Sequence, residues 1–252
     1  MLSFAIGVAH QAGRLLKQYY TSDLDIRTKS TDRDLVTQAD LDAEKIIISA
    51  IKETFPTHAI LAEEKGQIGH ADYLWLIDPL DGTTNFAHGH PVFCTSIGLA
   101  YQGEMCVAVI LDPIRNELFA AEKGKGASLN EKPIMVSDTK TLNNAVVATG
   151  FPYDRATNPH NNLKEFGQIM PLVQGIRRCG SAALDMAYVA SGRLDGYWEY
   201  HIKPWDVGAG ALMVKEAGGR VTSIDNSPWR LDSSALVAGN PNIHHQILEN
   251  IR

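Results

Sequence analysis

The N-terminal part of the chain contains two amphipathic stretches separated by a polar one. Apolar side chains recur every three or four residues between positions 3 and 20, which predicts a helix that buries one face. The polar stretch from 21 to 34 is expected to form a mobile loop. Thr37 is followed three residues later by Asp40, a pairing close to a capping box, so a second helix is predicted to begin there and to end before Pro56.

From Ala59 the pattern changes to short apolar runs separated by turn residues. These runs, which are typical of strands, are 59–62, 73–77, 95–101, 105–111 and 117–121. Gln102-Gly103 and Asp112-Pro113 indicate tight reversals between neighbouring runs. An antiparallel sheet that follows two helices is therefore predicted for residues 1–138.

The remaining residues, 139–252, mix helices and strands. Strands are expected near 145–149, 195–200, 220–224 and 235–239, and helices near 160–173, 181–191 and 206–217. Gly218-Gly219 can end a helix because glycine adopts the left-handed cap conformation, and Asn240-Pro241 can begin one. The pattern predicts an α/β protein of two layered subdomains, 1–138 and 139–252, the second with a mixed sheet.

Composition narrows the classes of protein that fit. The chain has 252 residues, 44% of them hydrophobic and 21% charged, which is ordinary for a globular protein. Its net charge of −6 is the wrong sign for holding a polyanion, so no nucleic-acid partner is expected. Three scattered cysteines fit a reducing compartment, and the N-terminal stretch resembles neither a signal peptide nor a membrane span. A cytoplasmic protein with no membrane partner is predicted.

The segment from Asp78 to Phe86 carries the most unusual chemistry. Asp78 and Asp81 are expected to leave the end of a buried strand together, close to Gly82, which permits close backbone approach. Carboxylates are the hard oxygen ligands that Mg²⁺ prefers, and the N–H groups of Gly82 and Thr83 can cradle a phosphate. Two aspartates at this spacing are also ordinary turn residues, so the pair alone leaves both interpretations open.

Further carboxylates follow other predicted elements. Glu63 and Glu64 come directly after the run 59–62, and Asp206 stands at the start of a predicted helix. An aspartate or serine at a helix N-terminus can be a simple cap, which is the alternative interpretation of Asp206 and of Ser181. Glu64 is interpreted as a solvated neighbour rather than a ligand.

These motifs resemble the signatures of a known family. Asp78-Pro79-Leu80-Asp81-Gly82-Thr83 and Trp205-Asp206-Val207-Gly208-Ala209-Gly210 are similar to the paired motifs of the inositol monophosphatase family, in the same order. The similarity extends to 34–40, Glu63-Glu64 and 180–183, and so covers nearly the whole chain. It implies an αβαβα sandwich of the sugar phosphatase type, with the active site where the two halves meet.

The resemblance also implies a set of functional residues. The metal ligands would be Glu63, Asp78, Asp81, Asp206 and the backbone carbonyl of Leu80, holding about two to three Mg²⁺ ions per subunit. Thr83, polarised by Asp40, and Glu63 would orient or deprotonate the attacking water, and no covalent phosphoenzyme is expected. Gly82 and Thr83 would bind phosphate. Gly180, Ser181, Ala182 and Glu199, together with Asp206, would contact substrate hydroxyls. Lys29 and Ser30 match a mobile loop that helps hold a further magnesium ion.

Several alternatives remain for the substrate. The resemblance favours hydrolysis of a small sugar or polyol phosphate, with inositol 1-phosphate first. Fructose 1,6-bisphosphate, histidinol phosphate and a nucleoside 3′-phosphate bisphosphate are the rivals. The family further implies a homodimer and inhibition by lithium. A different class of function is a regulatory binding partner in transcription, with phosphatase activity secondary.

Overall fold

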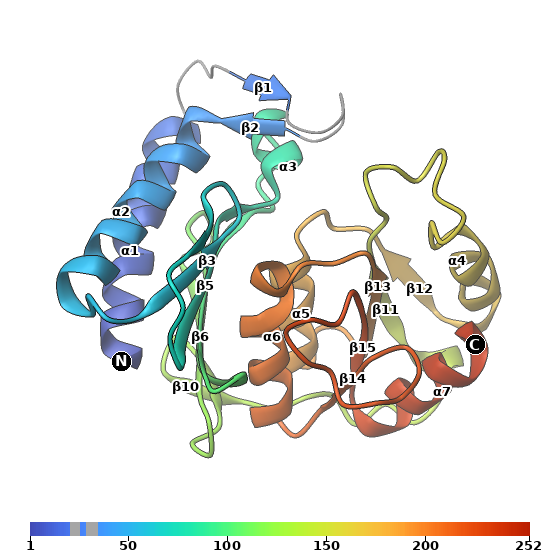
Figure 1. Cartoon of the computed structure of the whole chain (residues 1–252). Coiled ribbons are helices and arrows are strands. Elements are labelled where there is room, and N and C mark those ends of the chain that lie inside the picture. Colours follow the sequence, from blue (N-terminus) through green and yellow to red (C-terminus); the bar gives the residue numbers. More distant parts are fainter. Residues whose placement is uncertain (21–25, 29–34) are drawn as a thin grey trace.

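The computed structural model describes residues 1–20, 26–28 and 35–252. In this part of the chain, an eight-stranded and a five-stranded sheet alternate with three layers of helices (Figure 1). The order of layers is α1 and α2, the larger sheet, α5 and α6, the smaller sheet, and then α4 and α7. The predicted αβαβα sandwich is confirmed.

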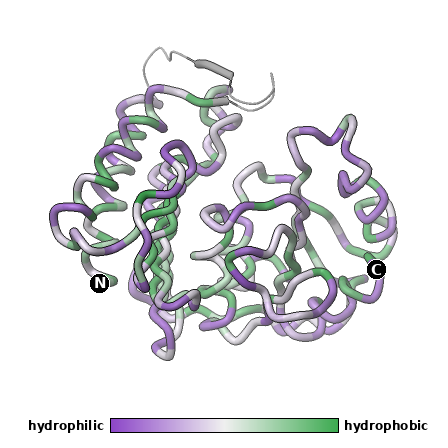
Figure 2. Tube along the Cα trace, viewed as in Figure 1, coloured by the Kyte–Doolittle hydropathy of each residue, from purple (hydrophilic) through white to green (hydrophobic). Residues whose placement is uncertain are grey.

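The first layer consists of the two helices predicted near the N-terminus. Helix α1 spans Leu2–Tyr20, and α2 spans Gln38–Thr54. Thr37 precedes α2, and its N–H and hydroxyl donate to Oδ2 of Asp40 at 2.8 and 2.6 Å. The expected cap therefore forms. The apolar faces of both helices pack on the larger sheet, where Figure 2 shows hydrophobic positions concentrated.

The larger sheet has, among the described residues, eight strands in the order β10-β9-β8-β7-β6-β5-β3-β4. Their bounds are β3 Ala59–Ala62, β4 Gly66–Ile68, β5 Tyr73–Asp81, β6 Cys94–Tyr101, β7 Glu104–Asp112, β8 Glu117–Glu122, β9 Ala127–Leu129 and β10 Lys132–Ile134. All neighbours are antiparallel except β3 and β5, so the predicted antiparallel sheet contains one parallel pair. Strand β4 pairs with the outer side of β3. The chain then returns to form β5 on the other side of β3, in the same direction as β3.

Strand β5 runs four residues beyond its predicted end. It pairs with β6 through Asp78 and again at Asp81, with a register shift between the two positions. Asp78 and Asp81 therefore belong to the irregular last part of the strand rather than to a turn beyond it. Gly82, at φ +99°, then leads into the short helix α3, Thr83–Ala87. A side chain at position 82 would meet the Val92 carbonyl oxygen at 2.8 Å, so only glycine fits there.

The middle layer is formed by α5, Ala182–Ala190, and α6, Pro204–Glu216. Helix α6 packs on β5, β6 and β7, and also on α5. It begins two residues before its predicted start, which makes Asp206 its third residue. Because these helices contact both sheets, one hydrophobic core crosses the predicted subdomain boundary. The division at residue 138 stays a prediction.

The smaller sheet has the strand order β12-β11-β13-β15-β14 in the described part of the chain. The strands are β11 Val146–Thr149, β12 Gly175–Arg177, β13 Gly196–Tyr200, β14 Arg220–Thr222 and β15 Ala235–Gly239. The first three are parallel and the others antiparallel, which confirms a mixed sheet.

The outer layer and the remaining short elements complete the fold. Helices α4, Leu163–Ile169, and α7, Pro241–Ile251, cover the outer face of the smaller sheet, and Asn240 caps α7 as predicted. Strands β1, Ile26–Thr28, and β2, Leu35–Thr37, form an antiparallel pair. Short 3₁₀ turns occupy 142–144 and 170–172. None of the described helices is long and apolar enough to cross a membrane.

Candidate active site

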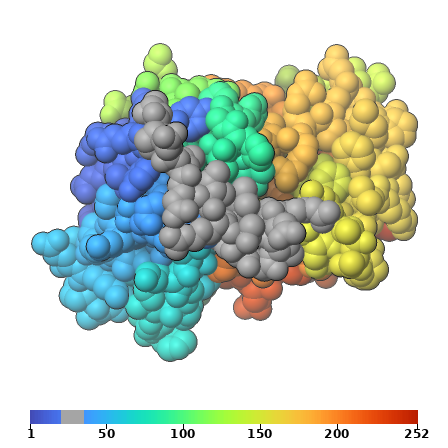
Figure 3. Space-filling model, turned by 90° about the horizontal axis from the view of Figure 1, so that it is seen from above, coloured from blue at the N-terminus to red at the C-terminus, as the bar shows by residue number. Residues whose placement is uncertain are grey.

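A cavity of about 440 Å³ lies where the two halves of the molecule meet. Figure 3 shows the molecule from above. Segments of the first half, in blue to green, lie on one side of this view, and segments of the second half, in yellow to orange, lie on the other. The predicted site residues that line the cavity are Glu63, Asp78, Leu80, Asp81, Gly82, Thr83, Gly180, Ser181, Ala182, Glu199 and Asp206. Asp40 is fully buried and hydrogen-bonds Thr83. Lys29 and Ser30 lie outside the described residues.

Glu63 and Asp78 come together because β3 and β5 are parallel. The C-terminal ends of these two strands lie side by side at one edge of the sheet. There the Glu63 N–H donates to the Ile77 carbonyl at 3.1 Å. The two side chains are themselves hydrogen-bonded. Burial raises the pKa of Asp78 well above its usual range, and the nearby charges of Glu63, Asp81 and Asp206 raise it further.

Asp81 is held by the opposite half of the protein. Its Oδ2 accepts hydrogen bonds from the Ser181 hydroxyl at 2.6 Å and from the Ala183 N–H at 2.7 Å, both at the start of α5. These bonds and the positive end of the helix favour the carboxylate. Burial outweighs them and raises the pKa of Asp81 to about 6. Ser181 also caps α5 by accepting the Leu184 N–H at 3.3 Å, so the cap interpretation of this residue is correct as well.

Asp206 reaches the same cavity from α6. Its Oδ2 accepts the Lys203 N–H at 2.9 Å, which caps the helix. The remaining carboxylate oxygen makes no such bond among the described residues. Burial, followed by the charges of Glu63 and Asp81, raises the pKa of Asp206 well above its usual range. The cap and the cavity position are therefore compatible.

The four carboxylates form a donor set that fits a hard cation. They repel one another in a partly buried site, and a divalent ion would relieve that repulsion. Within the described ranges, no three His, Cys, Asp or Glu side chains already converge closely enough to hold an ion. The bonds from Ser181 and Ala183 to Asp81 and from Lys203 to Asp206 all end on Oδ2 of the carboxylate.

Thr83 and Asp40, which the family resemblance pairs, are in direct contact. The Thr83 hydroxyl lies 3.0 Å from Oδ1 of Asp40 and 3.0 Å from the Leu80 carbonyl oxygen. Burial raises the pKa of Asp40 to about 6, although the hydrogen bonds from Thr37 oppose that shift. The Thr83 hydroxyl has one hydrogen, which it can donate to the Asp40 carboxylate or to the Leu80 carbonyl.

Glu199 borders the cavity from the last part of β13. It accepts a hydrogen bond from the hydroxyl of Tyr197, which lies two residues earlier on the same face of the strand. Burial raises the pKa of Glu199 to about 7, against the opposing effects of this hydrogen bond and of the Arg178 charge.

Several lining residues were not predicted from the sequence. Asp185 lies one turn after Ser181 on α5, is 2% exposed, and hydrogen-bonds the Cys179 thiol. Its Oδ1 has no hydrogen-bond partner in the described part of the chain. The four-residue spacing from Ser181 was the available signal, since it puts both residues on one helix face. Arg178 and Lys203 also line the cavity. Both are exposed basic residues, and no spacing or motif in the sequence indicated that they border the site.

Comparisons with known proteins agree with this fold. The model of the inositol monophosphatase family matches residues 1–252. The chain is 51% identical over 224 residues to inositol-1-monophosphatase of Synechocystis, covering 88% of this chain and 78% of that protein. It is 43% identical over 259 residues to Nus factor SuhB of Pseudomonas aeruginosa, covering 100% and 96%. The structure of inositol monophosphatase from Anabaena superposes with a TM-score of 0.91 at 46% identity, covering 99% and 94%.

Fold, cavity and sequence similarity together define the class of protein as a layered α/β phosphatase. The chain belongs to the inositol monophosphatase family.

Proposed function

We propose that the chain is a Mg²⁺-dependent phosphomonoester hydrolase whose preferred substrate is inositol 1-phosphate. The observation that carries the proposal is that four carboxylates, one directly after β3, two on β5 and one on α6, line one cavity between the two halves. Glu63, Asp78, Asp81 and Asp206 would hold about two to three ions, together with the Leu80 carbonyl. When bound, Mg²⁺ supplies Lewis acidity, which lowers the pKa of water and offsets phosphate charge.

Thr83 and Asp40 orient the attacking water in this proposal. Because Asp40 accepts the Thr83 hydroxyl hydrogen, the oxygen of Thr83 keeps lone pairs that can accept a hydrogen bond from water. Glu63 lies at the same edge of the cavity and serves as the base. The N–H groups of Gly82 and Thr83, at the start of α3, bind phosphate.

Substrate recognition falls to the opposite wall of the cavity. An ionised Glu199 can accept two hydroxyl hydrogen bonds, which suits a ring with adjacent hydroxyl groups. Gly180, Ser181 and Ala182 border the same space, with Asp206 nearby. A bisphosphate is the second candidate substrate, because Arg178 and Lys203 line the cavity and can offset a second phosphate.

A panel of phosphomonoesters tests the proposal. The ratio kcat/KM is measured with Mg²⁺ for inositol 1-phosphate, fructose 1,6-bisphosphate, histidinol phosphate and a nucleoside 3′-phosphate bisphosphate. The highest value is expected for inositol 1-phosphate, with activity lost in excess chelator. Hydrolysis that persists in chelator would contradict the metal dependence. A higher value for a bisphosphate would reassign the substrate.

A regulatory role is a second candidate function, since relatives at 41% to 43% identity are named Nus factor SuhB. Pull-down with the wild type and with Asp81→Asn separates the two roles. A partner that the inactive variant still binds would show a function independent of chemistry. The homodimer, the cytoplasmic location and lithium inhibition stay predictions.

A further inference from the structure

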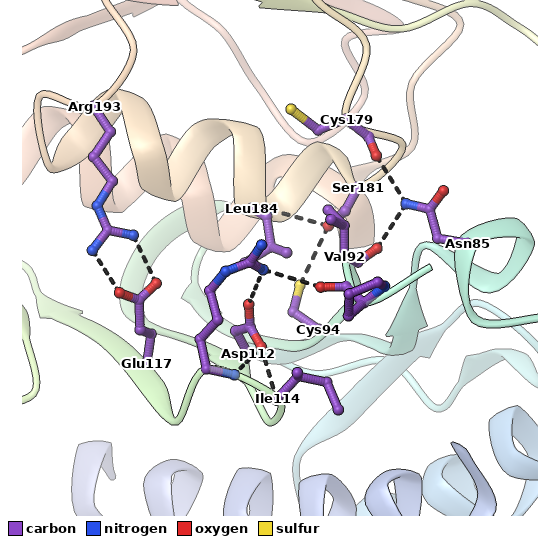
Figure 4. Close-up of polar contacts among 12 residues, drawn as sticks. Asn85, Val92, Cys94, Asp112, Ile114, Glu117, Cys179, Ser181, Leu184 and Arg193 are labelled. Atoms are coloured by element: carbon purple, nitrogen blue, oxygen red, sulfur yellow. Dashed lines mark hydrogen bonds and ion pairs between the residues drawn. The ribbon is translucent and has the colours of Figure 1, made fainter. Parts of the chain in front are cut away.

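One amide side chain joins the two halves of the protein beside the cavity. Asn85 lies on α3, and its Nδ2 donates to the Val92 carbonyl at 2.7 Å and to the Cys179 carbonyl at 2.8 Å (Figure 4). Val92 precedes β6 in the first half, whereas Cys179 belongs to the second half. Both hydrogens of the Nδ2 group are therefore used, one on each side of the crevice.

Gly180 is shaped to receive this amide. Its φ of +90° is a conformation that favours glycine, and a side chain there would meet Nδ2 and Oδ1 of Asn85 at 2.7 and 2.9 Å. The amide of Asn85 thus lies directly against the backbone at Gly180. The hydrogen bond from Nδ2 to the Cys179 carbonyl then holds the chain directly before Gly180.

The path of the chain through Gly180 sets the positions of the two groups that donate hydrogen bonds to Asp81. Ser181 follows Gly180 directly, and its hydroxyl donates to Asp81 at 2.6 Å. Its oxygen also lies 3.6 Å from the sulfur of Cys94 on β6 (Figure 4). Ala183, two residues further, donates its N–H to the same carboxylate oxygen. Displacement of the Cys179 carbonyl would move both donors relative to Asp81.

We propose that Asn85 is a positioning residue that locks the Gly180–Ala182 wall of the cavity against the carboxylate wall. It acts through Gly180 and Ser181 and does not itself line the cavity. The functional part of this inference rests on the proposed function, which assigns substrate hydroxyls to 180–182 and a metal ion to Asp81.

Two variants and a matched control test the positioning role of Asn85. Asn85→Ala removes both hydrogen bonds, and Asn85→Asp keeps the size but sets an acceptor against two carbonyl oxygens. Thr84→Ala is the control, because Thr84 is an exposed neighbour on the same helix. The readout is the ratio of kcat/KM for inositol 1-phosphate to that for p-nitrophenyl phosphate, which lacks the polyol. About a tenfold fall in this ratio is expected for both Asn85 variants, and no change for the control.

Amide hydrogen exchange of segment 179–184 supplies a second readout that needs no activity. Faster exchange at Ala183 and Leu184 is expected in both Asn85 variants, because these N–H groups bond to Asp81 and Ser181. Wild-type exchange in this segment, or an unchanged substrate ratio in a folded variant, would overturn the positioning role. If the wild type hydrolysed no ester, the proposed function would fail, while hydrogen exchange would still decide whether Asn85 locks the segment.

Discussion

The hydroxyl of Ser181 and the carboxylate of Asp81 are hydrogen-bonded at 2.6 Å, although they stand 100 positions apart in the sequence. The bond joins the start of α5 in the second half to the end of β5 in the first half. Together with the Ala183 N–H, this hydroxyl fixes the orientation of the Asp81 carboxylate. The arrangement and charge of the cavity therefore depend on contacts between the two halves, and the following predictions test those contacts.

Asp81→Asn and Asp206→Asn are expected to lower hydrolysis by about a hundredfold or more while leaving the fold intact. The carboxylates repel their neighbours in the metal-free protein, so their neutralisation should not lower Tm in chelator. Mg²⁺ should raise the Tm of the wild type and not that of the variants. The exposed Asp72 offers a control, Asp72→Asn, with wild-type behaviour. Normal turnover in either site variant would remove the metal assignment.

Asp40→Asn should lower kcat more than it changes KM, because Asp40 acts through the Thr83 hydroxyl rather than on phosphate. Thr83→Ala should lower kcat by a similar factor of about ten to a hundred. Since both changes break one hydrogen bond, their effects should not add in the double variant. Steady-state kinetics of the three variants measure this, and fully multiplicative losses would contradict a shared role.

Ser181→Ala should weaken Mg²⁺ binding by about tenfold, because Asp81 loses one of the two donors that orient it. Calorimetric titration of the protein with Mg²⁺ alone measures this without substrate. Ser191→Ala is the matched control, since Ser191 lies at the other end of α5, away from the cavity. Equal affinities in the two variants would show that the Ser181 bond does not orient the ligand.

The binding of a polyol phosphate should depend on pH through Glu199. Its pKa is raised from 4.5 to about 7, so the ionised form that accepts hydroxyl hydrogen bonds increases as pH rises through about 7. KM for inositol 1-phosphate should fall as pH rises over that range. In Glu199→Gln, this dependence of KM on pH should be absent. A raised pKa also means that this group stabilises the fold below pH 4.5 and loses that contribution as pH rises through about 7. Tm in chelator, compared between wild type and Glu199→Gln, checks the sign.

Glu44→Ala should lower the free energy of unfolding by about 2 kcal/mol. Oε2 of this buried glutamate accepts the N–H groups of Glu64 and Lys65 at 2.9 and 3.2 Å, directly after Glu63. Removal of the carboxylate leaves both donors without this acceptor. Glu44→Gln keeps an acceptor oxygen and should lose less. Chemical denaturation measures the difference, and equal losses would contradict the role of these bonds.

Local signals in the sequence were enough for the longer elements and for the main site motifs. The three- and four-residue spacing of α1, the cap at Thr37, and the strand bounds 59–62 and 235–239 all appear in the structure. Each depends on side chains within one turn or one strand. The order of the Asp78, Asp81 and Asp206 motifs likewise indicated one phosphatase family before any fold was known.

Short strands and long-range contacts required the tertiary structure. Strands β4, β9, β10 and β12 have three residues each, too few for a period to be recognised, and they form because a neighbouring strand offers its backbone. The parallel pairing of β3 with β5 follows from where the chain returns, which local pattern does not encode.

The same division holds within the site. Sequence alone identified Asp81 and Ser181 as candidates, each with a second interpretation as a turn residue or a cap. Their hydrogen bond, the contact of Asn85 with Gly180, and the raised pKa of Glu199 all arise from atoms distant in the chain. Sequence determined which chemical groups are present, and tertiary packing decided their partners and their charge, because burial and hydrogen bonding depend on what surrounds a group in space.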